Sequence, residues 1–138
     1  MSKIEDINGE VKFMQKIKVL AVDDSPCIHK AITKALDPEF FEICEFARNG
    51  RQGVNSYTAN QPDVVLMDIT MPIMDGLEAS KQIMALDPKA KIILLSAMWD
   101  DELIETAKNI GISANMNKPF KNDELSMTIN NLCKGMRD

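Results

Sequence analysis

The amino-acid sequence predicts an α/β fold in which helices cover both faces of a parallel sheet. Three observations support this prediction. Short, nearly continuous apolar runs at residues 17–22, 63–68 and 91–96 are typical of strands that are buried on both faces of a sheet. Segments with a helical apolar period separate these runs. The β-α order repeats five times along the chain, which is the order of a parallel sheet with helical connections.

The first strand and the first helix have the clearest signals. IKVLAV (17–22) is the first strand, and Ser25 followed by Pro26 predicts a helix start, with an N-cap and a proline at the first helical position. Asp37-Pro38 ends this helix, because a residue that precedes proline disfavours the helical conformation. Apolar residues at i, i+4, i+7 and i+8 form one stripe, which consists of Ile28, Ile32, Ala35 and Leu36.

The remaining elements continue the alternation. The mixed run FFEICEFA (40–47) is the second strand, and DVVLMD (63–68) and KIILLS (91–96) are the third and fourth. Asp87-Pro88 ends the helix between the third and fourth strands. ISANMN (112–117) alternates apolar and polar residues, which predicts a half-exposed edge strand. The last helix repeats the apolar spacing of the first, with Leu125, Ile129, Leu132 and Cys133.

Composition limits the classes of function. The chain has 138 residues, the size of one domain, and a net charge of -5, so we expect no nucleic-acid partner. No apolar run approaches the roughly 20 residues of a membrane span, and three separated cysteines without C-x-x-C indicate free thiols in a cytoplasmic protein. Residues 1–16 are mostly polar without a sustained period and are expected to form a tail or short arm, which leaves residues 17–138 as the domain.

Polar side chains follow the strands of the predicted sheet, at the point where each strand ends. Asp23 and Asp24 follow the first strand, Asp68 closes the third, Ser96 closes the fourth and Lys118 follows the fifth. Ligands of such sheets bind at the carboxyl ends of the strands, so these residues are expected to converge on one edge.

The chemistry of this set points to a metal and a phosphoryl group. Asp23 and Asp24 repel each other, so a positive partner is expected nearby. Together with Asp68 they make a hard oxygen site, which suits Mg²⁺. A carboxylate beside a divalent cation can attack a phosphoryl group and form an aspartyl-phosphate. The Lys118 ammonium and the Ser96 hydroxyl can then bind the phosphoryl oxygens.

Four motifs in this order resemble those of a known family. They are VDDS (22–25), Asp68 within LMDITMPIMDG (66–76), SA (96–97) and KPF (118–120), and each ends a predicted strand. With them the chain resembles the response-regulator receiver domains of bacterial two-component signalling and is similar to the stand-alone chemotaxis regulators. The resemblance runs from residue 17 to about residue 134. It implies a flavodoxin-like, doubly wound sheet of five parallel strands in the order 2-1-3-4-5.

The resemblance also implies roles for the acidic residues. Asp68 would be the phosphoacceptor and would bind Mg²⁺ directly together with Asp24, while Asp23 would act mainly through water. The backbone carbonyl of Thr70 would complete the protein ligands. Thr70 and Met98 occupy the positions that tune the lifetime of the phosphoryl group in this family. The loop after the third strand would be shaped by Met71-Pro72 and Asp75-Gly76.

The implied switch departs from the usual family pattern. Ser96 and Lys118 would bind the phosphoryl group, and the family often has an aromatic residue three positions before that lysine. Here the position holds Asn115, which is small and polar. We expect Met98 and Trp99, just after Ser96, to take over part of the coupling.

The resulting prediction is a phosphorylation-activated switch that catalyses only its own phosphorylation and dephosphorylation. The donor would be a phosphohistidine on a sensor histidine kinase or a phosphotransfer protein. The sequence ends soon after Cys133, too early for an effector domain, so output is expected through a downstream protein. That protein would bind the surface of the fourth helix, the fifth strand and the fifth helix.

Two alternatives stay open at this point. A Mg²⁺-dependent phosphohydrolase of the haloacid-dehalogenase type also forms an aspartyl-phosphate, but it requires D-x-D-x-[TV], whereas Asp23 and Asp24 are adjacent. A degenerate receiver that serves only as a docking module is the second alternative, and the complete acidic set argues against it. His29 lies off the apolar stripe of the first helix and is expected at the surface.

Overall fold

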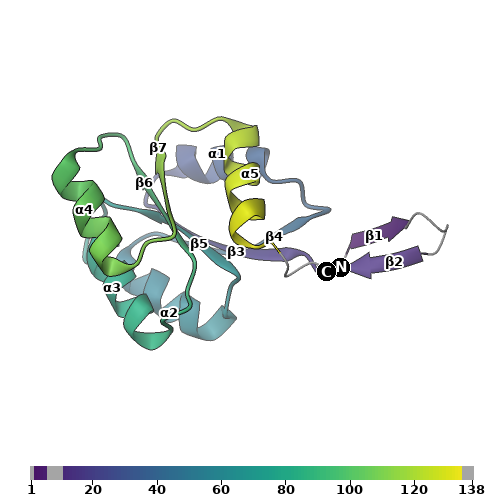
Figure 1. The fold of residues 1–138 in the computed structure, drawn as a ribbon, viewed down its shortest axis with the longest axis horizontal. Coiled ribbons are helices and arrows are strands. Elements are labelled where there is room, and N and C mark those ends of the chain that lie inside the picture. The colour runs from purple at the N-terminus through teal and green to yellow at the C-terminus, as the bar shows by residue number, and fades with distance from the viewer. Residues whose placement is uncertain (1, 6–10, 135–138) are drawn as a thin grey trace.

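The computed structural model, which describes residues 2–5 and 11–134, contains a five-stranded parallel sheet between two layers of helices (Figure 1). The strands of this sheet are β3 (Ile17–Val22), β4 (Phe41–Ala47), β5 (Val64–Asp68), β6 (Ile92–Ser96) and β7 (Ala114–Asn117). Their order is β4-β3-β5-β6-β7, and every neighbouring pair is parallel. This is the predicted order 2-1-3-4-5, counted from the first strand of the large sheet, so the predicted fold class is confirmed.

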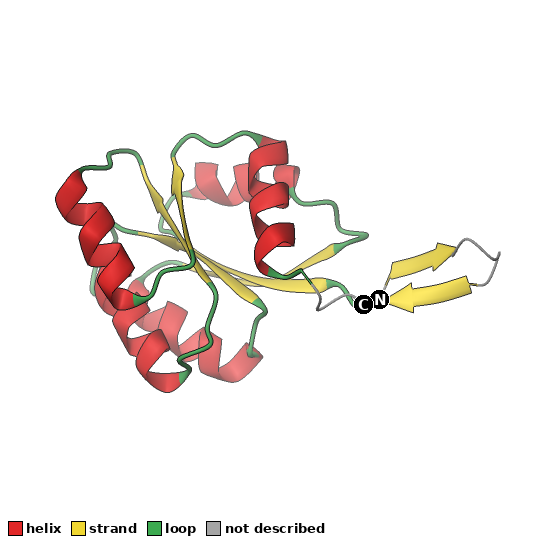
Figure 2. Cartoon of the chain, in the orientation of Figure 1, coloured by secondary structure: helices red, strands yellow, loops and turns green. Residues whose placement is uncertain are grey.

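The helices divide between the two faces of the sheet (Figures 1 and 2). They are α1 (Pro26–Ala35), α2 (Gly50–Asn60), α3 (Gly76–Leu86), α4 (Asp101–Ile110) and α5 (Asn122–Leu132). Helices α1 and α5 contact each other on one face, and α2, α3 and α4 line the other. Helices on both faces bury both sides of the central strands, which explains their continuous apolar runs.

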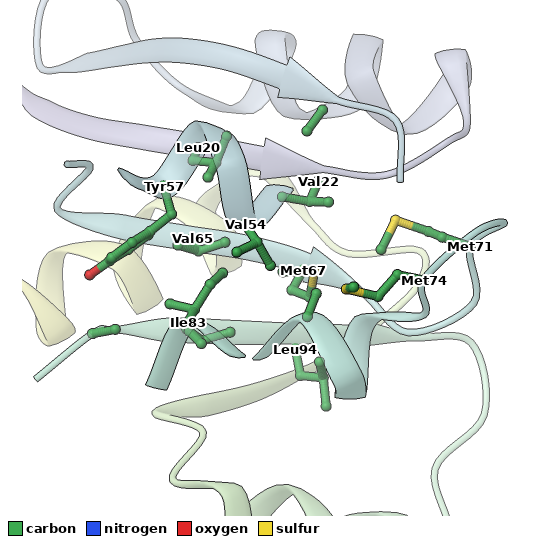
Figure 3. Packing of buried hydrophobic residues seen from close by; sticks show 14 of the residues in the cluster. Leu20, Val22, Val54, Tyr57, Val65, Met67, Met71, Met74, Ile83 and Leu94 are labelled. Carbon is green, nitrogen blue, oxygen red and sulfur yellow. The ribbon is translucent and has the colours of Figure 1, made fainter. Parts of the chain in front are cut away.

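Alternate residues of the central strand β3 enter two separate cores. Val19 and Ala21 pack in a cluster that includes residues of α1 and α5. Leu20 and Val22 pack in the opposite cluster with residues of α2, α3 and α4. Figure 3 shows this second cluster, in which both methionines of the loop after β5, Met71 and Met74, point into the packed region.

The first and third helices begin and end where local rules place them. The Ser25 hydroxyl caps α1 by accepting a hydrogen bond from the Ile28 amide at 3.4 Å, and Pro26 is the first helical residue. Helix α1 ends at Ala35, just before Asp37-Pro38, and α3 ends at Leu86, just before Asp87-Pro88. The predicted start of α1 and the predicted ends of α1 and α3 are therefore confirmed.

The N-terminal segment contains more structure than the sequence predicted. Strands β1 (Ser2–Glu5) and β2 (Val11–Met14) pair antiparallel in a two-stranded sheet of their own. In Figure 1 this hairpin projects from the N-terminal end of β3. The prediction of a tail or short arm named no strands here, because pairing through backbone groups does not require an apolar period. Residues 1 and 6–10 of the predicted tail and residues 135–138 of the predicted domain lie outside the described residues.

None of the helices in the described part of the chain has the length and apolar character needed to cross a membrane.

Candidate functional site

Three acids meet at the carboxyl edge of the sheet. Asp23 and Asp24 follow β3, and Asp68 is the last residue of the neighbouring strand β5. Each offers a carboxylate oxygen, and these oxygens all lie within 4.8 Å of one another. Parallel neighbouring strands end at the same edge, so the convergence predicted from the sequence is found.

Lys118 provides the positive partner that the adjacent acids require. It follows β7, and its Nζ lies 2.6 Å from Asp23 Oδ2 and 2.7 Å from Asp68 Oδ1. The Lys118 amide donates to the Ser96 carbonyl at 2.8 Å, so its backbone is fastened to the end of β6. The like charges of Asp23 and Asp68 are thus bridged by one ammonium.

Asp23 and Asp24 differ sharply in environment although they are adjacent. Asp23 is 1% exposed, and its Oδ1 accepts the Ser25 amide at 2.9 Å while Oδ2 accepts from Lys118. The Asp24 side chain is exposed and, within the described residues, its carboxylate accepts no hydrogen bond. Asp24 is therefore the acid whose oxygens are free for a ligand from solvent.

Glycine 76 allows α3 to begin directly beneath Asp68. A Cβ atom at Gly76 would lie 1.9 Å from the Asp68 carbonyl oxygen, so no side chain fits there. The Gly76 amide donates to the Ile69 carbonyl at 2.7 Å. Asp75 caps α3 by accepting from the Glu78 amide at 2.9 Å. The loop-shaping role expected for Asp75-Gly76 is confirmed.

The loop between Asp68 and α3 contains a tight turn with backbone strain. The Met74 amide donates to the Pro72 carbonyl at 2.7 Å, which closes a γ-turn around Ile73. Ile73 has φ +70°, a conformation that costs energy for a β-branched residue, and its side chain is 83% exposed. Thr70, the predicted carbonyl ligand, is exposed in the same loop.

Burial and charge shift the pKa values of Asp68 and Lys118. Burial raises the pKa of Asp68, and the nearby charges of Asp23 and Asp24 raise it further, while the hydrogen bond from Lys118 opposes them. Burial alone would lower the pKa of Lys118, but its hydrogen bonds and charge interactions with Asp23 and Asp68 outweigh burial and raise it. Three carboxylates against one ammonium leave an excess of negative charge on hard oxygen donors, and this donor set fits Mg²⁺.

Ser96 lies at the predicted strand end, but its hydroxyl is occupied in its own loop. The Oγ atom donates to the Met98 carbonyl at 2.7 Å and accepts from the Met98 amide at 3.1 Å. The Met98 side chain is 83% exposed. To donate this proton to any other acceptor, the Ser96 hydroxyl must release the Met98 carbonyl, whereas the bond from the Met98 amide uses a lone pair and can stay.

Trp99 joins this loop to the edge strand. Its Nε1 donates to the Met116 carbonyl of β7 at 3.1 Å, and the ring packs partly buried against the core. Asn115, the preceding residue of β7, is exposed. The structure thus links the loop after Ser96 to the strand that leads to Lys118, two residues beyond Met116.

Histidine 29 is the residue whose environment differs most from its expected one. It is half-buried, its ring stacks on Phe46 at a centroid distance of 4.5 Å, and its Nε2 lies 2.6 Å from the Asp23 carbonyl oxygen. Its place off the apolar stripe predicted a surface position, but strand β4 covers that side of α1 through Phe46. The feature of the sequence that could have indicated this contact is the position of His29 in α1, shortly after Asp23 and Asp24.

Comparison with known proteins identifies the family. Residues 19–130 match the family model described as the response regulator receiver domain, and this segment includes the three acids and Lys118. The match covers most of the chain, so the chain belongs to the response regulator receiver domain family.

Individual relatives agree with this assignment. The chain is 41% identical over 109 residues to the chemotaxis protein CheY of Listeria monocytogenes, which covers 79% of this chain and 92% of that protein. It is 31% identical over 112 residues to the sporulation initiation phosphotransferase F of Bacillus subtilis, covering 81% and 90% respectively.

A solved structure shows the same fold. A chain in the CheX-CheY complex with BeF3 and Mg²⁺ from Borrelia burgdorferi superimposes with a TM-score of 0.80 at 30% identity, covering 84% of this chain and 88% of that one. Family, relatives and fold together identify the chain as a response regulator of two-component signalling.

Proposed function

We propose that this chain accepts a phosphoryl group from a phosphohistidine donor onto Asp68 in a Mg²⁺-dependent reaction, and that phosphorylation changes its affinity for a protein partner. One observation carries the proposal. Asp68 Oδ1 is held by the Lys118 ammonium at 2.7 Å, while a ligand oxygen of Asp68 lies within 4.8 Å of one from Asp23 and one from Asp24.

The three acids would hold the metal, with the Thr70 carbonyl as a further ligand. Asp24 is the exposed member, and its oxygens have no partner in the part of the chain that the structure describes, whereas Asp23 is already bound to the Ser25 amide and to Lys118. This difference supports direct ligation by Asp24 and Asp68, with Asp23 acting through water. Bound Mg²⁺ would offset the charge that spreads over the phosphoryl oxygens during transfer.

Asp68 would attack with the oxygen that Lys118 does not hold. Within the described residues Oδ2 of Asp68 accepts no hydrogen bond, so its lone pairs are available. A P–O bond forms to Asp68 as the P–N bond to the donor imidazole breaks, and the electron pair of the broken bond returns to the ring nitrogen. Lys118 stays close enough to pair with the phosphoryl group that arrives.

The signal would travel through Ser96 and the loop that follows it. Phosphorylation adds about -1.5 to -2 charge with strong acceptor oxygens, which compete for the Ser96 hydroxyl. When Ser96 releases Met98, the loop and Trp99 lose one of their constraints, so the bond from Trp99 to β7 is the coupling contact in this proposal. Such a switch responds only to the extent that the phosphoryl group interacts differently with the two loop positions.

We place this protein in a cytoplasmic two-component signalling pathway. A sensor histidine kinase or phosphotransfer protein would be the donor, and a downstream protein rather than nucleic acid would be the target. The net charge of -5 supports the exclusion of nucleic acid, because the phosphate backbone repels an acidic protein. The chain would catalyse only its own phosphorylation and dephosphorylation.

The decisive experiment measures phosphoryl incorporation from acetyl phosphate by intact mass. Wild-type protein should gain one phosphoryl group when Mg²⁺ is present, and Asp68→Asn should gain none. Asp101→Asn, which changes an exposed acid in the first turn of α4, is the matched control and should behave as wild type. Unchanged incorporation by Asp68→Asn would contradict the proposal. Turnover of phosphate monoesters would favour a phosphohydrolase, and wild type that binds neither Mg²⁺ nor beryllofluoride would favour a docking module.

A further inference from the structure

The backbone at Asp24 sets the direction of the Cα–Cβ bond that carries its carboxylate. Its carboxylate is exposed and accepts no hydrogen bond from the described residues. The oxygens of Asp23, by contrast, are held by Ser25 and Lys118. The peptide group that joins Asp23 to Asp24 therefore sets the position from which the Asp24 side chain extends.

Hydrogen bonds hold the peptide groups on both sides of Asp23. On the N-terminal side, the Asp23 amide donates to the Ala47 carbonyl of β4 at 2.9 Å. On the C-terminal side, the Asp23 carbonyl lies 2.6 Å from His29 Nε2. A carbonyl oxygen can only accept, so Nε2 carries the proton and donates it to this bond.

The His29 ring is itself held from two directions. Its backbone is in α1, where the His29 amide donates to the Ser25 carbonyl at 3.2 Å. Its ring stacks on Phe46 of β4, with an angle of 30° between the planes. The donor nitrogen thus has little freedom to move relative to the strand that also holds the Asp23 amide.

We propose that His29 is a positioning residue of the metal site: its Nε2–H fixes the plane of the Asp23–Asp24 peptide and thereby aims the Asp24 carboxylate at Mg²⁺. This inference rests on the proposed function, in which Asp24 is a direct ligand. Groups that orient metal ligands without touching the metal commonly change metal affinity about 10- to 100-fold when they are removed.

Two variants separate the hydrogen bond from the stacking. His29→Phe keeps an aromatic ring against Phe46 and removes the donor. His29→Gln keeps an N–H donor of similar reach and removes the ring. A residue that only fills space would respond to the loss of the ring, whereas a positioning donor responds to the loss of the N–H.

The first measurement is Mg²⁺ binding by isothermal titration calorimetry on the full chain. His29→Phe should bind Mg²⁺ about tenfold more weakly than wild type, and His29→Gln should stay within about threefold of wild type. The second measurement needs no metal. The ¹³C chemical shift of the Asp23 carbonyl should move in metal-free His29→Phe and stay close to wild type in His29→Gln.

Each outcome bears on the inference. Equal Mg²⁺ affinity in wild type and His29→Phe would overturn it and leave the proposed function intact. Weak binding in both variants would also overturn it, because the ring and not the donor would then matter. If wild type itself binds no Mg²⁺, the proposed function fails and the inference fails with it.

Discussion

Replacement of Lys118 by methionine tests the electrostatics of the site most directly. The side chains have similar length, but methionine has neither charge nor donor. Wild-type Lys118 Nζ lies 2.6 Å from Asp23 Oδ2 and 2.7 Å from Asp68 Oδ1, and the two acids are 1% and 7% exposed. The variant leaves both carboxylates in place with no cation to offset them.

The expected loss of stability follows from these contacts. At an effective dielectric constant of about 20, each contact contributes roughly 6 kcal/mol of Coulomb attraction, most of which offsets the cost of burying the charges. Breaking a buried pair by removing one partner costs about 3–5 kcal/mol. Because the Lys118 side chain is 16% exposed, we expect the lower end, about 3 kcal/mol at neutral pH. For a chain of 138 residues this lowers the unfolding midpoint by roughly 10 °C.

The assay is thermal and urea unfolding followed by circular dichroism, in EDTA and again in saturating MgCl₂. Mg²⁺ should stabilise Lys118→Met more than wild type, because the ammonium no longer competes for the carboxylates. Lys121→Met is the control, since the Lys121 side chain is exposed and forms no hydrogen bond or ion pair with the described residues. If Lys118→Met in EDTA stays within about 1 kcal/mol of wild type, the bridge does not offset buried charge and the reasoning is wrong.

Four further outcomes are expected. Because the pKa of Asp68 is raised from 3.8, the folded state binds more protons than the unfolded state in the pH window just above that value. Wild-type stability should therefore fall as pH rises through this window, and Asp68→Asn should lack this fall in urea titrations. Because the pKa of Lys118 is raised from 10.5, its contribution is complete below that pH and should disappear as pH rises above it, a decline that should be absent in Lys118→Met. Ile73→Gly should raise the unfolding free energy by about 0.5–1 kcal/mol, because relief of the backbone strain at φ +70° exceeds the entropy cost of glycine. A loss of stability in this variant would mean that the Ile73 side chain packs against the protein in solution. Trp99 emission should change when beryllofluoride is added with Mg²⁺, because its Nε1 holds β7; constant emission would rule out the proposed coupling contact.

Much of the fold could be predicted because buried strands and helices require a periodic pattern of apolar residues in the sequence. Strands covered on both faces need apolar residues at almost every position, and residues 17–22 show such a run, broken only by Lys18. Ser25 and Asp37-Pro38 act on backbone groups close to them in the sequence, so the ends of α1 can be predicted without knowledge of distant neighbours. The hairpin of β1 and β2 has no comparable signal in the sequence, since its pairing uses backbone groups that all sequences share.

The residues that form the candidate site could be predicted from the sequence, but their hydrogen-bond partners could not. Asp23 and Asp68 had to meet because they end neighbouring parallel strands. The occupation of the Ser96 hydroxyl by Met98 was not predictable, because a serine at a strand end has several local partners of similar energy. The contact of His29 with the Asp23 carbonyl was hidden as well, since it depends on Phe46 of β4 covering the ring.

The order of strands and helices, and hence the set of acids and lysine at one edge, was determined by the sequence alone. Tertiary structure decided which oxygen each acid offers. Lys118 holds one oxygen each of Asp23 and Asp68, and neither oxygen of Asp24 has a partner among the described residues. The reason is one of scale. Apolar patterning acts over whole elements and survives small shifts, whereas the choice of a hydrogen-bond partner depends on fractions of an ångström between side chains that several separate elements bring together.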